Sequence, residues 1–293
     1  MPKYLDPKND LTFKRIFADH PHLLVDFLNA VMPFEEDRFI VTLEYLPGEM
    51  PPQRRKDKFS IVDVRCKDNF GRQFIVEMQM FWDKGFYNRL IFNAGKAYMR
   101  QLAIGEKYHL LQPVYTLALV NENFDLKTDK FYHHFQIVNR ENTDEIMPGL
   151  EFVMIELTDK FNPEIYAEQG RSTVTDRKLM ILWLRFMKEV NENLRKLPDE
   201  MSQNEHISEA AKLCEIGAFT PEELAEYDKI WDIIRTEKTL LDGRFADGLQ
   251  KGRAESEEII KEKDKTIEQK DKAIEQYAKE LEELKRQLKH NSQ

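Results

Sequence analysis

The chain has 293 residues, 41% of them hydrophobic, which is enough to bury the core of one large domain or two ordinary ones. Its formal net charge of −9 excludes attraction of nucleic acid by the overall field, so any binding to phosphates requires a local basic patch. Two cysteines cannot supply a disulfide framework or a four-ligand zinc site, and we find neither an apolar run of about 18 residues nor an apolar signal core, which favours a cytoplasmic protein.

The first 60 residues predict two helices and a strand. A capping residue opens the helix at 10–17, a second helical stretch covers 23–31, and residues 39–46 alternate like a strand. The basic run Arg54-Arg55-Lys56 follows in a loop. It could contact phosphates, although a charge cluster in a loop is more often only a solvated surface.

Residues 59–80 predict a β-hairpin, because two apolar runs rich in β-branched residues flank a short polar turn. If residues 69–71 form a three-residue loop with Gly71 in the left-handed conformation, the numbers of paired residues add to 140. That register places Asp63 opposite Glu77.

The predicted register therefore brings two carboxylates together on adjacent strands. Like charges in that position destabilise the pair unless a cation lies between them, so Asp63 and Glu77 are candidate metal ligands. Both are hard oxygen donors that suit Mg²⁺ or Mn²⁺, and no nearby His or Cys supports zinc. Gln79 lies on the Glu77 face, where its amide could orient water. A four-residue loop would instead place Asp63 opposite Val76, and an acid in a half-exposed strand is usually only solvated.

The segment 87–104 predicts an amphipathic helix. Its inward face is expected to consist of Leu90, Ile91, Ala94, Ala97, Tyr98 and Leu102. A second, basic stripe consists of Arg89, Asn93, Lys96 and Arg100. If this helix packs beside the hairpin, the stripe could follow a nucleic-acid backbone near the acids, but an ordinary solvated face gives the same pattern.

The rest of the globular part predicts a buried strand at 113–120, shorter strands at 135–138 and 152–157, and helices at 178–190 and 205–216. A capping box at 220–223, with Pro221 in the first helical position, starts a further helix that we expect to end near Leu241.

The segment 254–289 is almost free of helix breakers and predicts a coiled coil, because apolar residues recur there every seven positions. The first seam position holds Ile260, Ile267, Ile274, Leu281 and Leu288, and the second holds Tyr277 and Leu284 in the last two heptads. Lys263 and Lys270 occupy the second position in the earlier heptads, so a single charged helix is the alternative.

Four motifs together carry a family resemblance. The chain contains N-D-x-x-F-K-x-x-F from Asn9, V-D-V around Asp63, I-V-E-M-Q from Ile75, and R-x-x-x-N-A-x-x-A-Y from Arg89. Over roughly residues 1 to 250 this pattern resembles the recombination-promoting nuclease and transposase family of the PD-(D/E)XK nuclease superfamily. No motif of serine hydrolases, P-loop proteins, zinc proteases or dinucleotide-binding proteins is present.

The resemblance implies an α/β fold with a restriction-endonuclease-like core of order αβββαβ, Mg²⁺-dependent DNA cleavage, and a role in recombination or a bacterial mobile element. By this resemblance Asp63 and Glu77 match the metal-binding acids, Asp10 matches the acid of the first helix, and Gln79 takes the place of the superfamily lysine. Val62 stands where the superfamily has proline. Because Gln79 carries no charge, Arg89, Lys96 or a second metal ion would have to stabilise the transition state.

We therefore expect a nuclease domain over 1–165, a helical region over 166–242, and a glycine-spaced linker with a coiled coil over 243–293. The expected function is that of a DNA endonuclease dependent on Mg²⁺ or Mn²⁺. The expected catalytic residues are Asp63, Glu77, Gln79 and Asp10, with the first two as metal ligands, and the expected DNA-binding residues are Arg54, Arg55, Arg89, Lys96 and Arg100. The coiled coil is expected to form a homodimer. Two alternatives are a catalytically silent DNA-binding or accessory protein with the same fold, and a scaffold protein built on the coiled coil.

Overall fold

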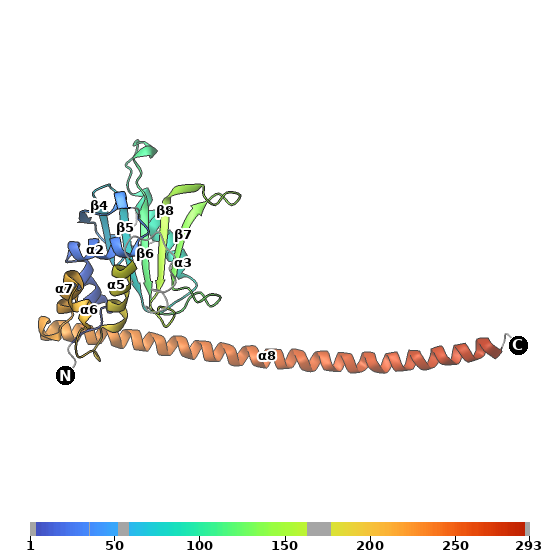
Figure 1. Cartoon of the computed structure of the whole chain (residues 1–293). Coiled ribbons are helices and arrows are strands. Elements are labelled where there is room, and N and C mark those ends of the chain that lie inside the picture. The colour runs from blue at the N-terminus through green and yellow to red at the C-terminus, as the bar shows by residue number, and fades with distance from the viewer. Residues whose placement is uncertain (1–3, 35, 52–58, 163–176, 291–293) are drawn as a thin grey trace. The chain divides into compact units, whose positions relative to one another are not determined.

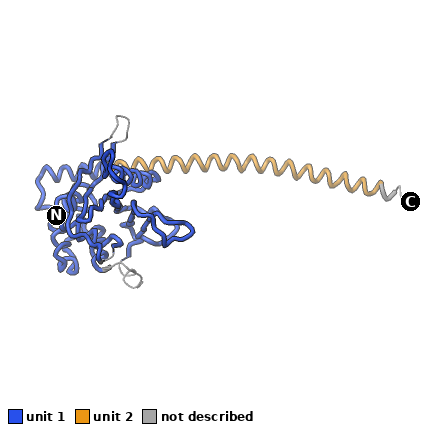
Figure 2. The backbone as a smooth tube through the Cα atoms, turned by 90° about the horizontal axis from the view of Figure 1, so that it is seen from above, with its two compact units in different colours: residues 1–234 blue, residues 235–293 orange. Residues whose placement is uncertain are grey.

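The computed structural model describes residues 4–34, 36–51, 59–162 and 177–290. They belong to two compact units, Met1–Ile234 and Arg235–Gln293, which Figure 2 shows in different colours.

A six-stranded sheet forms the centre of the first unit, with strand order β1-β4-β5-β6-β8-β7. The strands are β1 (Leu43–Tyr45), β4 (Val64–Asp68), β5 (Gln73–Gln79), β6 (Val114–Val120), β7 (Tyr132–Val138) and β8 (Ile146–Glu156). Strands β5, β6 and β8 run parallel, whereas the pairs β1–β4, β4–β5 and β7–β8 are antiparallel. Every residue of β6 is buried, which confirms the expected central strand. A separate two-stranded sheet pairs β2 (Glu49–Met50) with β3 (Ser60–Ile61).

Helices cover both faces of the large sheet, which confirms the expected α/β class (Figure 1). Helix α3 (Phe86–Met99) lies on one face. The other face is covered by helices that include α1 (Asp10–Phe17), α2 (Pro21–Val31), α5 (Arg177–Glu189) and α7 (Glu205–Leu213), with the short α6 (Asp199–Ser202) between the last two in the chain. Residues of β5 divide between the two cores, because alternate side chains point to opposite faces. Phe74 and Val76 pack with α1, α2 and α5, whereas Ile75 packs with Ala94 and Ala97 of α3.

The β4–β5 hairpin has the register that the sequence predicts. Val64 lies opposite Val76, and Lys67 lies opposite Gln73, so the residue numbers of each pair add to 140. Gly71 has a φ of 81°, and its N–H donates to the carbonyl oxygen of Asp68 over 3.0 Å. The three-residue loop is therefore confirmed, and the alternative four-residue loop is wrong.

Two expectations about helices are wrong. Helix α3 ends at Met99, so Leu102 lies beyond it, and Ile91 is 55% exposed because it lies at the border of the buried face. Helix α8 (Pro221–His290) does not end near Leu241 but continues through Gly243, Gly248 and Gly252. Glycine in a helix interior costs only about 1 kcal/mol relative to alanine, which strong helix formers on either side offset.

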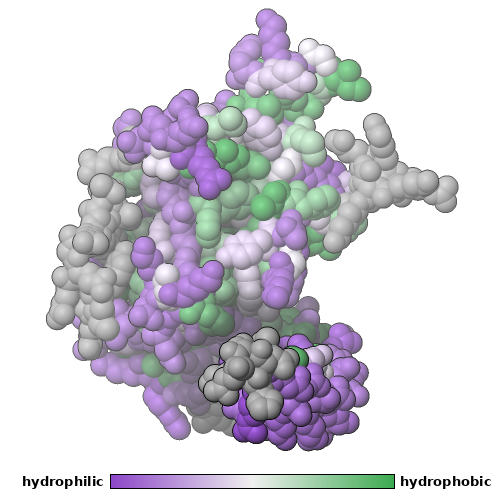
Figure 3. All heavy atoms as spheres, turned by 90° about the vertical axis from the view of Figure 1, so that its right-hand side faces the viewer, coloured by the Kyte–Doolittle hydropathy of each residue, from purple (hydrophilic) through white to green (hydrophobic). Residues whose placement is uncertain are grey.

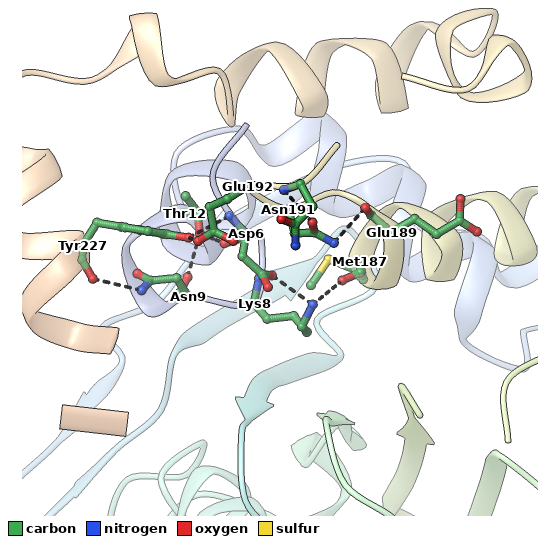
Figure 4. Close-up of polar contacts among 10 residues, drawn as sticks. Asp6, Lys8, Asn9, Thr12, Met187, Glu189, Asn191, Glu192 and Tyr227 are labelled. Atoms are coloured by element: carbon green, nitrogen blue, oxygen red, sulfur yellow. Dashed lines mark hydrogen bonds and ion pairs between the residues drawn. The ribbon is translucent and has the colours of Figure 1, made fainter. Parts of the chain in front are cut away.

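A buried polar network joins the N-terminal segment to α5 and the first turns of α8 (Figure 4). The ammonium of Lys8 lies 3.0 Å from Asp6 and donates to the carbonyl oxygen of Met187 over 3.1 Å. The hydroxyl of Tyr227 accepts the backbone N–H of Asp6 over 2.9 Å and donates to the Glu192 carboxylate. These bonds satisfy charged and polar groups that would otherwise be buried without partners.

The second unit consists of the later turns of α8 and the residues that follow. The apolar side chains of the predicted seam between Ile260 and Leu284 are exposed. The end-on view in Figure 3 shows mostly hydrophilic side chains around the helix. None of the described helices combines the length and the hydropathy that a membrane span requires.

Candidate active site

The predicted acid pair lies at the start of β4 and near the end of β5. Asp63 occupies the bend directly before β4, and continuing the hairpin register by one residue places it level with Glu77. The carboxylate of Asp63 accepts the backbone N–H of Met78, with 2.7 Å between Oδ2 and N. This bond holds the Asp63 side chain against β5.

Electrostatic coupling shows that the two carboxylates are neighbours. Burial, and next the negative charge of Asp63, raise the pKa of Glu77 to about 8. Burial also raises the pKa of Asp63 to about 6, against the opposing effect of the Met78 N–H, and the charge of Asp10 adds to the rise. Glu77 is only 7% exposed, so little water screens the repulsion. The pair is destabilising when both groups are ionised.

Asn93 of α3 is a site residue that the sequence analysis assigned only to the basic stripe. Its side-chain Nδ2 donates to Glu77 Oε1 over 3.3 Å, and the residue is 2% exposed. The signal in the sequence was its position four residues after Arg89, which places both side chains on the same side of α3. The hydrogen bond favours the ionised form of Glu77 and lowers its pKa.

Gln79, two residues after Glu77 on β5, is bonded at both ends of its amide. Its Oε1 accepts from Arg89 Nη2, and its Nε2 donates to the carbonyl oxygen of Phe81 over 2.5 Å. The charge of Arg89 lowers the pKa of both Asp63 and Glu77. A positive charge near the acids therefore comes from the Arg89 guanidinium of α3, whereas Gln79 of β5 is neutral.

Helix α1 contributes an acid and a cation to the surroundings of the pair. Asp10 stands in the first turn of α1, which the side chain of Asn9 caps, and it raises the pKa of Asp63. The ammonium of Lys14 lies 2.9 Å from Asp10 Oδ2, and its charge lowers the pKa of Asp63 and of Glu77. Lys14 was quoted in a sequence motif but was not predicted as a site residue.

Two further basic residues of the predicted DNA-binding set, Lys96 and Arg100, bond to backbone carbonyl groups. Lys96 is 8% exposed, and its Nζ donates to the carbonyl oxygen of Met50 over 2.6 Å. Arg100 donates to the carbonyl oxygen of Pro51. The exposed stripe expected on α3 is therefore wrong for Lys96, because β2 covers it. Arg54 and Arg55 lie outside the described residues.

The donor set of the acid pair fits a hard divalent cation. Asp63 and Glu77 offer only oxygen atoms, and the charge of Asp63 raises the pKa of Glu77, a repulsion that a bound cation relieves. Among the described residues, no group of three or more His, Cys, Asp or Glu side chains is arranged to hold a metal. Mg²⁺ is commonly held by one or two carboxylates with water and substrate oxygens, so two acids are sufficient for it, whereas zinc requires more protein ligands.

Comparison with known proteins places the chain in a family. No curated protein and no solved structure matches it. A family model described as "PD-(D/E)XK nuclease family transposase" matches residues 7–243, well over half of the chain. The matched range contains α1, the β4–β5 hairpin and α3, which are the elements that carry the site. The chain therefore belongs to the PD-(D/E)XK nuclease family transposases.

Proposed function

We propose that the protein is a metal-dependent deoxyribonuclease that hydrolyses phosphodiester bonds and acts in DNA recombination or in a mobile element. The observation that carries the proposal is the pair of Asp63 and the buried Glu77, in which burial, and next the charge of Asp63, raise the pKa of Glu77 to about 8. Two acids that repel each other destabilise a fold, so such a pair points to a functional site. Family membership supports phosphodiester bonds as the substrate class.

The site residues have distinct roles in this proposal. Asp63 and Glu77 would hold Mg²⁺ or Mn²⁺, and such an ion polarises a phosphoryl oxygen and lowers the pKa of a bound water. Asn93 and the Met78 N–H each fix one carboxylate, so that both are oriented before the ion binds. Asp10 adds negative charge at the edge of the pair. We assign α1, β1, β4, β5, α3 and β6 to the αβββαβ core of the superfamily.

We propose two partners, which are DNA and a second copy of the chain. The basic residues that we propose for DNA binding are Arg54, Arg55, Arg89 and Arg100. Lys96 is left out of this set, because it is buried and its ammonium donates to the Met50 carbonyl. The exposed seam of α8, with Ile267, Leu281 and Leu284 each more than half exposed, supports pairing of two chains through a coiled coil.

A plasmid-nicking assay tests the activity. We expect nicking in Mg²⁺ or Mn²⁺, none in EDTA, and none with Asp63→Asn or Glu77→Gln. Glu44→Gln is the matched control, because Glu44 is an exposed acid of the same sheet that pairs with Lys67. Metal-independent DNA binding without cleavage would support the catalytically silent alternative, and it would overturn the proposed activity.

A further inference from the structure

The amide of Gln79 has a fixed direction. Only the oxygen of an amide can accept from a guanidinium, and only its nitrogen can donate to a carbonyl. Arg89 binds the oxygen and the Phe81 carbonyl binds the nitrogen, so the two partners reinforce a single orientation. An amide used in this way is a support for Arg89 rather than the water-orienting group that the sequence suggested.

Arg89 is held from a second side by its own helix. Its guanidinium carbon lies 4.7 Å from the centre of the ring of Phe86, the first residue of α3, and Phe86 is fully buried against the sheet. A ring face attracts a cation and limits the rotation of its side chain. The bond to Gln79 uses one of the five N–H donors of a guanidinium, so the exposed Arg89 can donate to a phosphate while it stays attached.

The other cations near the acids are engaged elsewhere. Lys96 is buried and donates to the Met50 carbonyl, although its position on α3 resembles that of Arg89. Lys14 forms an ion pair with Asp10 four residues before it.

We infer that Arg89 is the catalytic cation of this site and that Gln79 is the positioning residue that holds it. In the superfamily a lysine on the strand supplies the positive charge. In this arrangement Arg89 of α3 supplies the charge instead, and the neutral amide of Gln79 on β5 holds its guanidinium in place. The inference rests on the proposed nuclease function. It assigns to Arg89 the stabilisation of the negative charge that develops on the phosphate during cleavage.

A double-mutant cycle of the full-length protein tests the inference. With saturating protein and Mn²⁺, we expect Arg89→Met to lower the single-turnover cleavage rate about 100-fold, while the half-saturating protein concentration changes far less. Gln79→Leu should lower the rate roughly 10-fold in the wild type but have no further effect in Arg89→Met, because a positioning residue without its partner does nothing. Gln79→Lys combined with Arg89→Met should recover part of the rate.

Two controls sharpen the result. Arg140→Met removes an exposed arginine from the loop between β7 and β8 and should leave the rate unchanged. Lys14→Met removes the competing cation and should reduce the rate less than Arg89→Met does. Arg89→Lys, which keeps the charge and the fold, should retain more activity than Arg89→Met. A wild-type rate in Arg89→Met, equal losses from Gln79→Leu in both backgrounds, or a larger loss in Lys14→Met would each overturn the inference.

A second readout does not depend on cleavage. In EDTA, the effects of Arg89→Met and Gln79→Leu on the melting temperature should be non-additive, because each variant removes the same contact. Additive effects would overturn the pairing. If the wild type cuts no DNA but the melting temperatures are coupled, the proposed function fails while the contact stands, so the two failures are distinguishable.

Discussion

The Asn93 side chain of α3 donates a hydrogen bond to the Glu77 carboxylate of β5 over 3.3 Å. Both residues are buried, so the bond fixes the direction of the carboxylate before any cation arrives. Groups that orient a metal ligand typically contribute 10-fold to 100-fold to metal affinity. We expect Asn93→Ala to weaken Mn²⁺ binding by about 10-fold, measured by calorimetry. Asn88→Ala is the matched control, because Asn88 is an exposed asparagine of the same helix. Equal affinity in the two variants would show that Asn93 does not orient a ligand.

The raised pKa values of the acid pair predict a metal-free protein that loses stability as the pH rises. For an acid whose pKa is higher in the folded than in the unfolded state, the stabilising contribution is complete below the unfolded value and is lost as the pH passes the folded value. For Glu77 this window extends from the ordinary value of 4.5 to about 8. The free energy of unfolding in EDTA should therefore fall between these pH values, by at most about 1.4 kcal/mol per pH unit from this group, and the melting temperature should fall with it.

Glu77→Gln should flatten that pH dependence, because it removes the titrating group and its repulsion of Asp63. At pH 8 the variant should melt at or above the wild-type temperature in EDTA. Adding Mg²⁺ should raise the melting temperature of the wild type and not that of the variant. A wild type whose stability in EDTA is independent of pH over this window would contradict the proposed repulsion.

The hairpin register was predictable from the sequence, because a glycine in a three-residue loop leaves one pairing of the flanking strands. That register, continued by one residue beyond the pair of Val64 and Val76, places Asp63 level with Glu77. The partners of α3 were not predictable in the same way. Helical periodicity puts Arg89, Asn93 and Lys96 on one stripe but does not show which neighbour each one meets. Only the fold shows that Lys96 meets the carbonyl of Met50, a residue 46 positions earlier in the chain.

The buried network around Asp6 was missed for a related reason. A charged residue near the start of a chain is usually solvated, and the polar pattern of these residues contains no periodicity. Their partners, which include Glu192 and Tyr227, lie more than 180 residues away and are brought there by the packing of α8 against the N-terminal segment. Long-range polar pairs of this kind leave no trace in local sequence.

Tyr227→Phe should destabilise the first unit. Removing the hydroxyl leaves the Asp6 N–H without its acceptor and Glu192 without its donor, and a lost buried hydrogen bond of this kind costs about 1 to 3 kcal/mol. Tyr108→Phe makes the same chemical change at an exposed residue outside this network, so it should leave the stability unchanged. Urea unfolding followed by tryptophan fluorescence measures both variants. Equal midpoints would show that the network does not stabilise the fold.

Salt dependence separates the arginines that contact DNA from those that do not. Each phosphate contact contributes about 0.9 to the slope of log affinity against log salt concentration. Arg89→Gln should therefore reduce the slope by about 0.9, and Arg54→Gln with Arg55→Gln by about 1.8. Lys96→Met should change stability and not the slope, because the ammonium is buried against Met50. Fluorescence anisotropy with a DNA duplex at several salt concentrations measures the slopes. A normal slope in all the arginine variants would move the binding surface elsewhere.

The last prediction concerns the exposed seam of α8. Ile260, Ile267, Ile274 and Leu281 follow one another at intervals of seven residues, and each is more than half exposed on the surface of α8. A lone helix would leave this apolar stripe in water, whereas pairing with the same stripe of a second chain buries it.

Pairing through this seam should be strongest toward the C-terminal end of α8, because Lys263 and Lys270 interrupt the earlier heptads and Tyr277 and Leu284 complete the later ones. Leu281→Asp should therefore convert a dimer to a monomer in light scattering. Gln276→Asp introduces the same residue outside the seam and should leave the dimer intact, which separates seam burial from helix propensity.

Two paired nuclease units could each cut one strand of a duplex, so Leu281→Asp should also lower the yield of double-strand breaks relative to nicks at equal site concentration. A monomeric wild type would refute the pairing. If Leu281→Asp is monomeric but gives the same ratio of double-strand breaks to nicks as the wild type, the coiled coil does not serve to bring two cleavage sites together.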